Sequence, residues 1–129
     1  DTLLSLYPNE GASISQLRAL TDKALGLVDS PASDVDNIEA IGEGWVAEET
    51  LAIAVYCAVK YFDNFEKAII ASVNHKGDSD STGAVTGNIL GVVVGYDAIP
   101  EFFKTDLELH DVILHVADDL WIGKTTKFI

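Results

Sequence analysis

The sequence has little of what several classes of protein require. Its single cysteine, Cys57, cannot form a disulfide within the chain, and there is no Asn-X-Ser/Thr glycosylation triplet. Lysine and arginine number 8 against 21 aspartate and glutamate residues, a formal net charge of -13 at pH 7. This charge repels phosphate backbones and anionic lipids, so we expect binding neither to nucleic acid nor to a membrane. The low cysteine content indicates a reducing compartment, and we expect a cytoplasmic protein.

The sequence also lacks targeting and membrane-spanning segments. Its first ten residues, DTLLSLYPNE, have no basic start and only a short apolar run, unlike a secretory signal peptide. The most apolar stretch, residues 81–97, offers only about a dozen apolar residues where a membrane span needs roughly 20. Methionine is absent throughout, including at position 1, so we expect the chain to be part of a longer polypeptide.

What is present is the composition of a folded domain. The 129 residues are 48% hydrophobic, and the mean hydropathy is +0.21. This is too apolar for a disordered acidic tail, and the length is enough to bury a core. We therefore expect a single domain over residues 1–129.

Hydrophobic periodicity predicts an all-α fold, because apolar residues recur at helical spacing and no convincing strand pattern occurs. Residues 46–62 are apolar on every side after Thr50, which indicates a central helix with Cys57 in the core. Residues 29–37, rich in Asp and Ser around Pro31, are predicted to form a loop, and GEGW at 42–45 a tight turn. The predicted helices are 14–28, 46–62, 65–75, 81–96 and 107–121.

Glycine recurs every four residues in the fourth of these helices, at positions 83, 87, 91 and 95. Four such residues lie on one ridge of a helix, and each costs roughly 1 kcal/mol relative to alanine. The pattern predicts that another helix packs closely along this ridge.

An acidic loop precedes the same helix and reads VNHKGDSDSTG over residues 73–83. Asp78, Asp80 and Ser81 place two carboxylates and a hydroxyl together, which are hard oxygen ligands of the kind that Mg²⁺ and Ca²⁺ prefer. The alternative is that Asp78 and Ser79 only cap the helix. Likewise, His75 is expected either to interact with the carboxyl end of the preceding helix or to hydrogen-bond a metal-bound carboxylate.

An EF-hand explains the acidic loop less well. Asp78, Asp80 and Gly83 match positions one, three and six of that calcium loop. Position twelve, however, requires a bidentate glutamate and holds Ile89. The sequence therefore excludes an EF-hand.

A family resemblance runs from about residue 42 to residue 95 and on to residues 117–121, and it is carried by residues 42–91 and 117–121. They read GEGWVAEETLAIAVYCAVKYFDNFEKAIIASVNHKGDSDSTGAVTGNILG and ADDLW, and they resemble the C-terminal half of the ADP-ribosylglycohydrolase family. The resemblance implies an all-α, multi-helical fold and magnesium-dependent hydrolysis of the glycosidic bond between ADP-ribose and an acceptor. It implies a two-magnesium site to which Asp78, Asp80 and Ser81 supply ligands. Gly44 and Trp45 would contact the adenosine side of the substrate, although Trp45 also fits an aromatic anchor at a helix start.

Two departures from the family pattern limit what this chain is expected to do alone. Lys76 stands where the family has glycine, and it is expected to obstruct substrate or pair with Asp78. No Thr-Asp-Asp motif occurs, so only half of the metal site is expected here. The other half would come from a missing N-terminal portion or a second copy. The alternative is a catalytically inactive metal-binding or structural domain, or a self-associating helical module, derived from the same fold.

Overall fold

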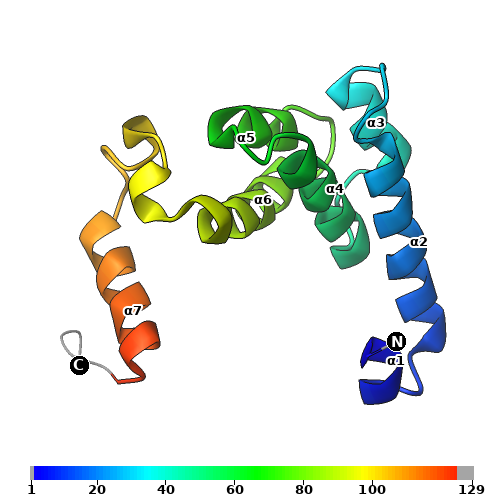
Figure 1. The fold of residues 1–129 in the computed structure, drawn as a ribbon, viewed down its shortest axis with the longest axis horizontal. Helices are drawn as coiled ribbons and strands as arrows, with labels where there is room; N and C mark the ends of the chain where they lie inside the picture. The colour runs from blue at the N-terminus through cyan, green and yellow to red at the C-terminus, as the bar shows by residue number, and fades with distance from the viewer. Residues whose placement is uncertain (1, 125–129) are drawn as a thin grey trace. The chain divides into compact units, whose positions relative to one another are not determined.

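The structure is a computed structural model that describes residues 2–124, and it contains helices but no strand in that range. The prediction of an all-α fold is confirmed (Figure 1). The chain divides into two compact units, Asp1–Ala98 and Ile99–Ile129, each described here by itself. None of the described helices combines the length and the apolar character needed to cross a bilayer.

The first unit contains nearly all of the packed helices. Its elements are α1 (Thr2–Leu6), α2 (Gly11–Leu27), α3 (Asp34–Ile41), α4 (Ala47–Lys60), α5 (Phe65–Val73), α6 (Ser79–Val94) and the 3-10 helix η1 (Tyr96–Ala98). The second unit contains the 3-10 helix η2 (Glu101–Phe103) and α7 (His110–Ile122).

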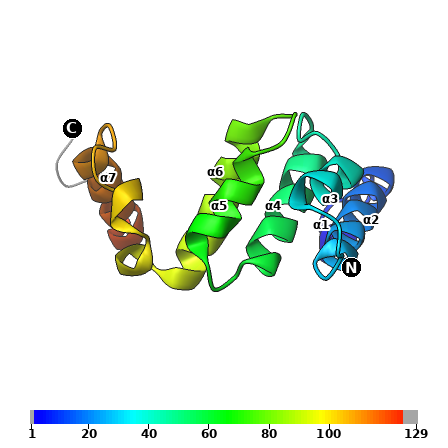
Figure 2. The ribbon, with the colours of Figure 1, turned by 90° about the horizontal axis from the view of Figure 1, so that it is seen from above.

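Helix α4 is the centre of the first unit, as its apolar sequence predicts. It packs against α2 and α3 on one side and against α5 and α6 on the other (Figure 2). Cys57 is completely buried in it, and this burial raises the pKa of the thiol to about 12, which keeps the sulfur protonated and unreactive. The buried α4 residues are Thr50, Ala52, Ile53, Ala54, Tyr56, Cys57 and Ala58.

The segment predicted as a loop, residues 29–37, instead contains the start of α3, so that prediction is wrong from Asp34 onward. The Ser33 hydroxyl accepts a hydrogen bond from the Asp36 N–H at 3.1 Å, which caps the helix. Asp34 and Asp36 lie in the first turn, where the helix dipole favours negative charge. The Asp and Ser residues therefore mark a helix N-terminus here rather than a break in the helical structure.

The glycine ridge of α6 is closely packed along only part of its length. A Cβ added to Gly83 would lie 2.6 Å from Val73 Cγ1 of α5, and one added to Gly87 would lie 3.7 Å from Ile69 Cδ1. At Gly91 and Gly95 a Cβ would meet nothing within 4 Å, so the prediction of close packing is wrong there. The reason is length, because α5 has 9 residues and cannot cover the 16 of α6.

In the second unit, α7 begins at His110, three residues later than predicted. Leu109, at its N-cap, has a left-handed φ of 59°, which stops the helix from extending toward Leu107. No residue of α7 is buried, and Trp121 is 92% exposed. The ADDLW stretch therefore lies on a helix that presents its apolar side chains to the outside.

Candidate functional site

The turn at residues 42–45 is fixed by two side chains from the start of α4. The Glu49 Oε2 atom accepts hydrogen bonds from the N–H groups of Glu43 at 3.1 Å and Gly44 at 3.0 Å. The Thr50 hydroxyl donates to the Gly44 carbonyl at 2.7 Å. Gly44 has a φ of +80°, a conformation that glycine adopts without steric cost. The GEGW sequence thus forms a turn whose backbone polar groups are satisfied by α4.

The acidic loop between α5 and α6 is organised around Thr82, which is completely buried. Its hydroxyl lies 2.6 Å from the Ser72 carbonyl oxygen and 3.0 Å from that of Asp78, so it bridges the end of α5 and the start of α6. His75 Nε2 lies 2.9 Å from the same hydroxyl, and His75 Nδ1 accepts from the Gly77 N–H at 3.1 Å. Because Nδ1 is an acceptor, the hydrogen-bond pattern assigns the proton to Nε2. His75 thus supports the loop backbone and makes no hydrogen bond to a carboxylate.

The turn and the acidic loop are in direct backbone contact. The Asp78 N–H donates to the Glu43 carbonyl at 2.8 Å. A Cβ added to Gly77 would lie 1.7 Å from that same oxygen, so no larger residue fits at position 77 without moving the turn. A Cβ on Gly44 would lie 2.9 Å from Thr82 Cγ2. The glycines in both motifs therefore allow the two segments to approach each other.

Asp78, Asp80 and Ser81 lie together at the N-terminus of α6, where the sequence placed them. Asp78 is the N-cap, and its carboxylate accepts from the Ser81 N–H at 3.4 Å. Side-chain hydrogen bonding with Asp80, and after it with Ser81, holds the pKa of Asp78 below its ordinary value. Asp80 is exposed in the first turn of the helix. The capping role of Asp78 is thus present, and the exposed Asp80 carboxyl lies beside it.

The donor set of this loop suits a hard cation but is incomplete. Two carboxylates and a hydroxyl are oxygen ligands of the type that Mg²⁺ takes. No group of three or more His, Cys, Asp or Glu side chains within residues 2–124 is arranged to hold a metal ion. The residues fit one part of a coordination shell, whose remaining ligands this part of the chain does not provide.

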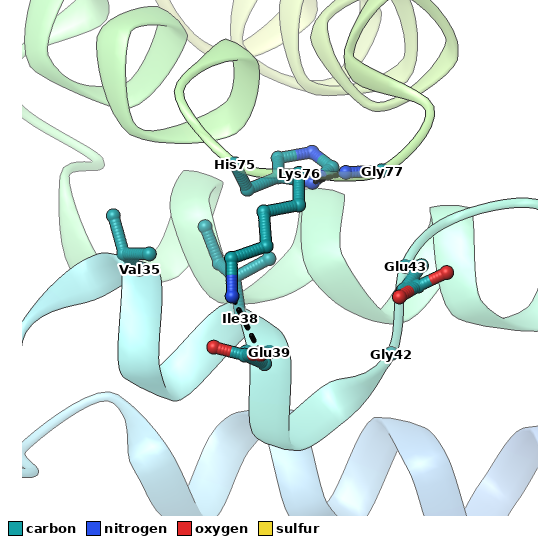
Figure 3. A pocket seen from close by; sticks show the side chains of 8 residues that line it. All are labelled: Val35, Ile38, Glu39, Gly42, Glu43, His75, Lys76 and Gly77. Atoms are coloured by element: carbon teal, nitrogen blue, oxygen red, sulfur yellow. Dashed lines mark hydrogen bonds and ion pairs between the residues drawn. The ribbon is translucent and has the colours of Figure 1, made fainter.

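Lys76 pairs with Glu39 and not with Asp78, so the predicted pairing with Asp78 is wrong, while obstruction of substrate by Lys76 stays a prediction. Its Nζ lies 3.1 Å from Glu39 Oε1 of α3, and its side chain is 74% exposed (Figure 3). Lys76 thus contacts α3, while Asp78, two residues later, is the N-cap of α6. The positive charge of Lys76 is therefore held by Glu39 rather than by Asp78.

A small pocket lies beside Lys76 and below the acidic loop, and Figure 3 shows its lining. Its volume is about 10 Å³, which is room for about one water molecule. It is far too small for a nucleotide. The lining residues are Val35, Ile38, Glu39, Gly42, Glu43, His75, Lys76 and Gly77.

Trp45 follows the turn and lies on the surface, with 66% of its area exposed. Its Nε1 donates to Glu43 Oε2 at 3.1 Å, which links the indole to the turn that contacts the acidic loop. Gly44 is buried behind it, with its N–H bound by Glu49 and its carbonyl by Thr50. The indole is thus exposed to solution, as is the neighbouring Glu43, whereas Gly44 is buried.

Two residues that build the site were missed by the sequence analysis, Glu49 and Thr82. The signal for Glu49 was its place in the first turn of a helix, where a glutamate commonly reaches back to preceding N–H groups. The role of Thr82 depends on a carbonyl ten residues earlier in the chain. No local pattern carries that information.

Comparison with known proteins gives a consistent result. A family model described as ADP-ribosylglycohydrolase matches residues 1–128. The ADP-ribosylarginine hydrolase Tri1 of Serratia proteamaculans is 36% identical over 83 residues, 64% of this chain and 22% of that protein. The human ADP-ribosylhydrolase ARH3 is 26% identical over 81 residues, 55% of this chain and 22% of its own length. The ADP-ribosyl-[dinitrogen reductase] glycohydrolase of Rhodospirillum rubrum is 38% identical over 47 residues, 36% of this chain and 16% of that enzyme.

The matched segments thus span only about a fifth of each of these curated relatives. No solved structure matches the chain.

Proposed function

The chain belongs to the ADP-ribosylglycohydrolase family, and we propose that it forms part of an enzyme that hydrolyses the bond between ADP-ribose and an acceptor. The observation that carries the proposal is the contact between the GEGW turn and the acidic loop. Through the Asp78 N–H and the Glu43 carbonyl, it joins the residues proposed to bind metal to those proposed to bind substrate. Both motifs that underlie the family resemblance thus meet at one place.

In this proposal, Asp78, Asp80 and Ser81 hold Mg²⁺. The support is chemical, because their oxygens are hard ligands and no Lys or Arg in residues 2–124 forms an ion pair with either carboxylate. When bound, magnesium fixes ribose hydroxyls and lowers the pKa of a bound water. Asp78 remains the cap of α6, which fixes the direction of its carboxylate relative to Ser81.

A bound cation also accounts for how so acidic a protein accepts an anionic substrate. The net charge is -13, and the diphosphate of ADP-ribose would be repelled by Asp78 and Asp80 alone. Neutralising these carboxylates removes the local repulsion. We therefore propose that ADP-ribose binds in the presence of magnesium and not in its absence.

We propose that Gly44 and Trp45 lie on the adenosine side of the bound substrate. An exposed indole beside the turn offers a flat face for a purine base. Gly44 contributes by shape, since its lack of a side chain lets the turn approach Thr82. The relatives named above act on ADP-ribosylated arginine or on ADP-ribosylated dinitrogen reductase. We accordingly propose that the acceptor is a protein side chain, so that the substrate is an ADP-ribosylated protein.

The remaining magnesium ligands are proposed to come from outside this chain. The incomplete donor set within residues 2–124 requires them, and they would lie in another part of the same polypeptide or in a second copy. Exposed apolar side chains on α1, Leu3, Leu4 and Leu6, are compatible with further protein covering this unit. If these ligands are absent, the chain binds metal or other protein without hydrolysis, which is the second candidate function.

Tryptophan fluorescence tests the proposal, because the sequence contains only two tryptophans. In a Trp121→Phe variant, Trp45 is the only tryptophan left. Titration of this variant with ADP-ribose in magnesium should give a saturable change in emission, and the same titration in EDTA should give none. A flat titration in magnesium would contradict the proposed substrate site. Hydrolysis is measured as ADP-ribose released from an ADP-ribosylated protein by the polypeptide that carries the remaining ligands, and Asp80→Ala should abolish it.

A further inference from the structure

Glu49 lies in the first turn of α4, but its carboxylate does not cap that helix. The N-cap of this helix is Val46, whose side chain makes no capping hydrogen bond. A glutamate three residues after an N-cap ordinarily reaches back to the N–H of the cap itself. Glu49 instead reaches further and accepts from Glu43 and Gly44, which lie before the cap. Its carboxylate therefore holds the turn rather than the end of its own helix.

The residue that Glu49 holds is also the one that holds the acidic loop. The Glu43 N–H donates to Glu49 Oε2 at 3.1 Å, and the carbonyl of the same residue accepts from the Asp78 N–H at 2.8 Å. A displacement of Glu43 thus moves the acceptor of Asp78. The tight fit of Gly77 against Glu43 leaves no room for the loop to keep its place while the turn shifts.

Sterics confine the Glu49 carboxylate as well. A Cβ added to Gly42 would lie 2.5 Å from Glu49 Cδ and 2.9 Å from its Oε1. The carboxylate is therefore seated between Gly42 and the N–H groups of the turn. A substitution at Gly42 displaces it without changing the charge of the protein.

We infer that Glu49 is a positioning residue that sets the place of the Asp78–Ser81 loop through the turn at residues 42–45. It acts through Glu43 and Gly44, and it does not itself belong to a metal-binding cluster within the described residues. The functional meaning of this role rests on the proposed function. The structural part of the inference, that the position of the loop depends on the Glu49 carboxylate, is independent of the proposed function.

Amide hydrogen exchange of Asp78, measured by NMR on the metal-free chain, tests the inference. Glu49→Ala removes the acceptor, and the Asp78 amide should exchange about tenfold faster relative to the buried Cys57 amide, the loss expected for a hydrogen bond to a charged group. Glu49→Gln keeps one side-chain oxygen and should restore most of the protection. Gly42→Ala should imitate Glu49→Ala.

The matched control is Glu48→Ala, which removes the same charge from the same helical turn. It should leave the ratio of Asp78 to Cys57 exchange unchanged. Equal ratios in Glu49→Ala and Glu48→Ala would overturn the inference. So would an Asp78 amide that exchanges as slowly in Glu49→Ala as in the wild type.

A magnesium titration of the same variants separates the inference from the proposed function. If wild-type protein binds magnesium, Glu49→Ala should weaken the affinity about tenfold, while Glu49→Gln and Glu48→Ala stay near the wild type. If Glu49→Ala binds as tightly as the wild type, the inference is overturned and the metal site stands. If the wild type binds no magnesium, the proposed metal site fails, and the exchange ratios alone decide the inference.

Discussion

The two ends of helix α4 hold acidic groups in opposite ways. At its carboxyl end, Asp34 of α3 accepts hydrogen bonds from Tyr56 at 2.7 Å, Lys60 at 2.8 Å and Tyr61 at 2.7 Å. At its amino end, α4 fixes a turn that supports Asp78 and Asp80, and no protein cation in residues 2–124 pairs with them. The first carboxylate has its countercharge built into the fold. The second pair has no such countercharge among the described residues, and in the proposed function a cation from solution supplies it.

The pKa directions follow this difference. Burial raises the pKa of Asp34, but hydrogen bonds from Lys60, then Tyr56 and Tyr61, outweigh it and bring the pKa below 3.8. Lys60 in turn has a raised pKa, because its bonds to Asp34 and Tyr56 outweigh its desolvation. At the other end, the pKa of Asp78 is lowered mainly by Asp80, itself an acid. The Asp34 network thus supplies its own countercharge, whereas Asp78 and Asp80 form an open acidic pair with no such partner in residues 2–124, which is the pair that the proposed function assigns to metal binding.

The largest expected effect comes from removing Asp34. Asp34→Ala leaves Lys60, Tyr56 and Tyr61 without their shared acceptor, and we expect the free energy of unfolding to fall by about 3 kcal/mol. Urea denaturation measures this. Asp63→Ala, at an exposed acid in the turn after α4, serves as control and should change stability by less than about 0.5 kcal/mol. Equal losses in the two variants would remove the distinction between a built-in and an open carboxylate.

A glycine pair tests the contact at the amino end of α4. Gly77→Ala forces a Cβ against the Glu43 carbonyl and should lower the free energy of unfolding by about 2 kcal/mol. Gly91→Ala, on the uncovered part of α6, should instead raise it by about 0.8 kcal/mol through helix propensity. Thermal or urea denaturation of both variants measures the contrast. A neutral Gly77→Ala would mean that the turn and the acidic loop are not in tight contact.

The stability contributed by Asp34 should depend on pH with a defined sign. Because its pKa in the folded protein lies below the ordinary value of 3.8, this contribution is present above pH 3.8 and is lost as the pH falls through the folded value. The difference in unfolding free energy between the wild type and Asp34→Asn should therefore shrink in that acidic window. Urea denaturation at a series of pH values measures it. A difference that stays constant to the lowest pH would contradict the ion-pair account.

The smallest expected effect is at Lys76. Its pair with Glu39 is exposed, so Lys76→Ala should change the free energy of unfolding by less than about 0.5 kcal/mol. Because Lys76 faces α3, magnesium affinity should change little as well. Calorimetric titration with magnesium measures this second expectation. A marked gain in affinity would show that the charge of Lys76 acts on Asp78 after all.

Local sequence patterns predicted much of the fold, and the predictions that were wrong have identifiable physical causes. The apolar sequence of α4 predicted its central position. The two glycines within residues 42–45 predicted the turn that precedes α4. The start of α3 was missed because Asp and Ser favour both loops and helix N-termini, and the pattern alone does not separate them. Close packing was predicted along the whole glycine ridge, because the glycine spacing does not show that α5 is shorter than α6.

The sequence predicted which residues form the candidate site, but not which side chains hold them in place. Asp78, Asp80 and Ser81 were found from their chemistry and from the family resemblance. The network around Asp34 was not, since Tyr56 and Tyr61 lie 22 and 27 residues further along the chain. The place of Glu49 in the first turn of a helix was a signal for capping, but its actual partners, the backbone N–H groups of Glu43 and Gly44, carry no residue-specific signal in the sequence.

Magnesium titration of the wild type, Asp80→Ala and Glu66→Ala, read by calorimetry, tests the central claim most directly. Asp80 and Glu66 lie in the first turns of neighbouring helices, and each substitution removes one negative charge. The open acidic pair predicts that the wild type and Glu66→Ala bind magnesium alike and that Asp80→Ala does not bind it. Magnesium binding by Asp80→Ala that equals the wild type would contradict the claim and would leave Asp78 as a helix cap alone.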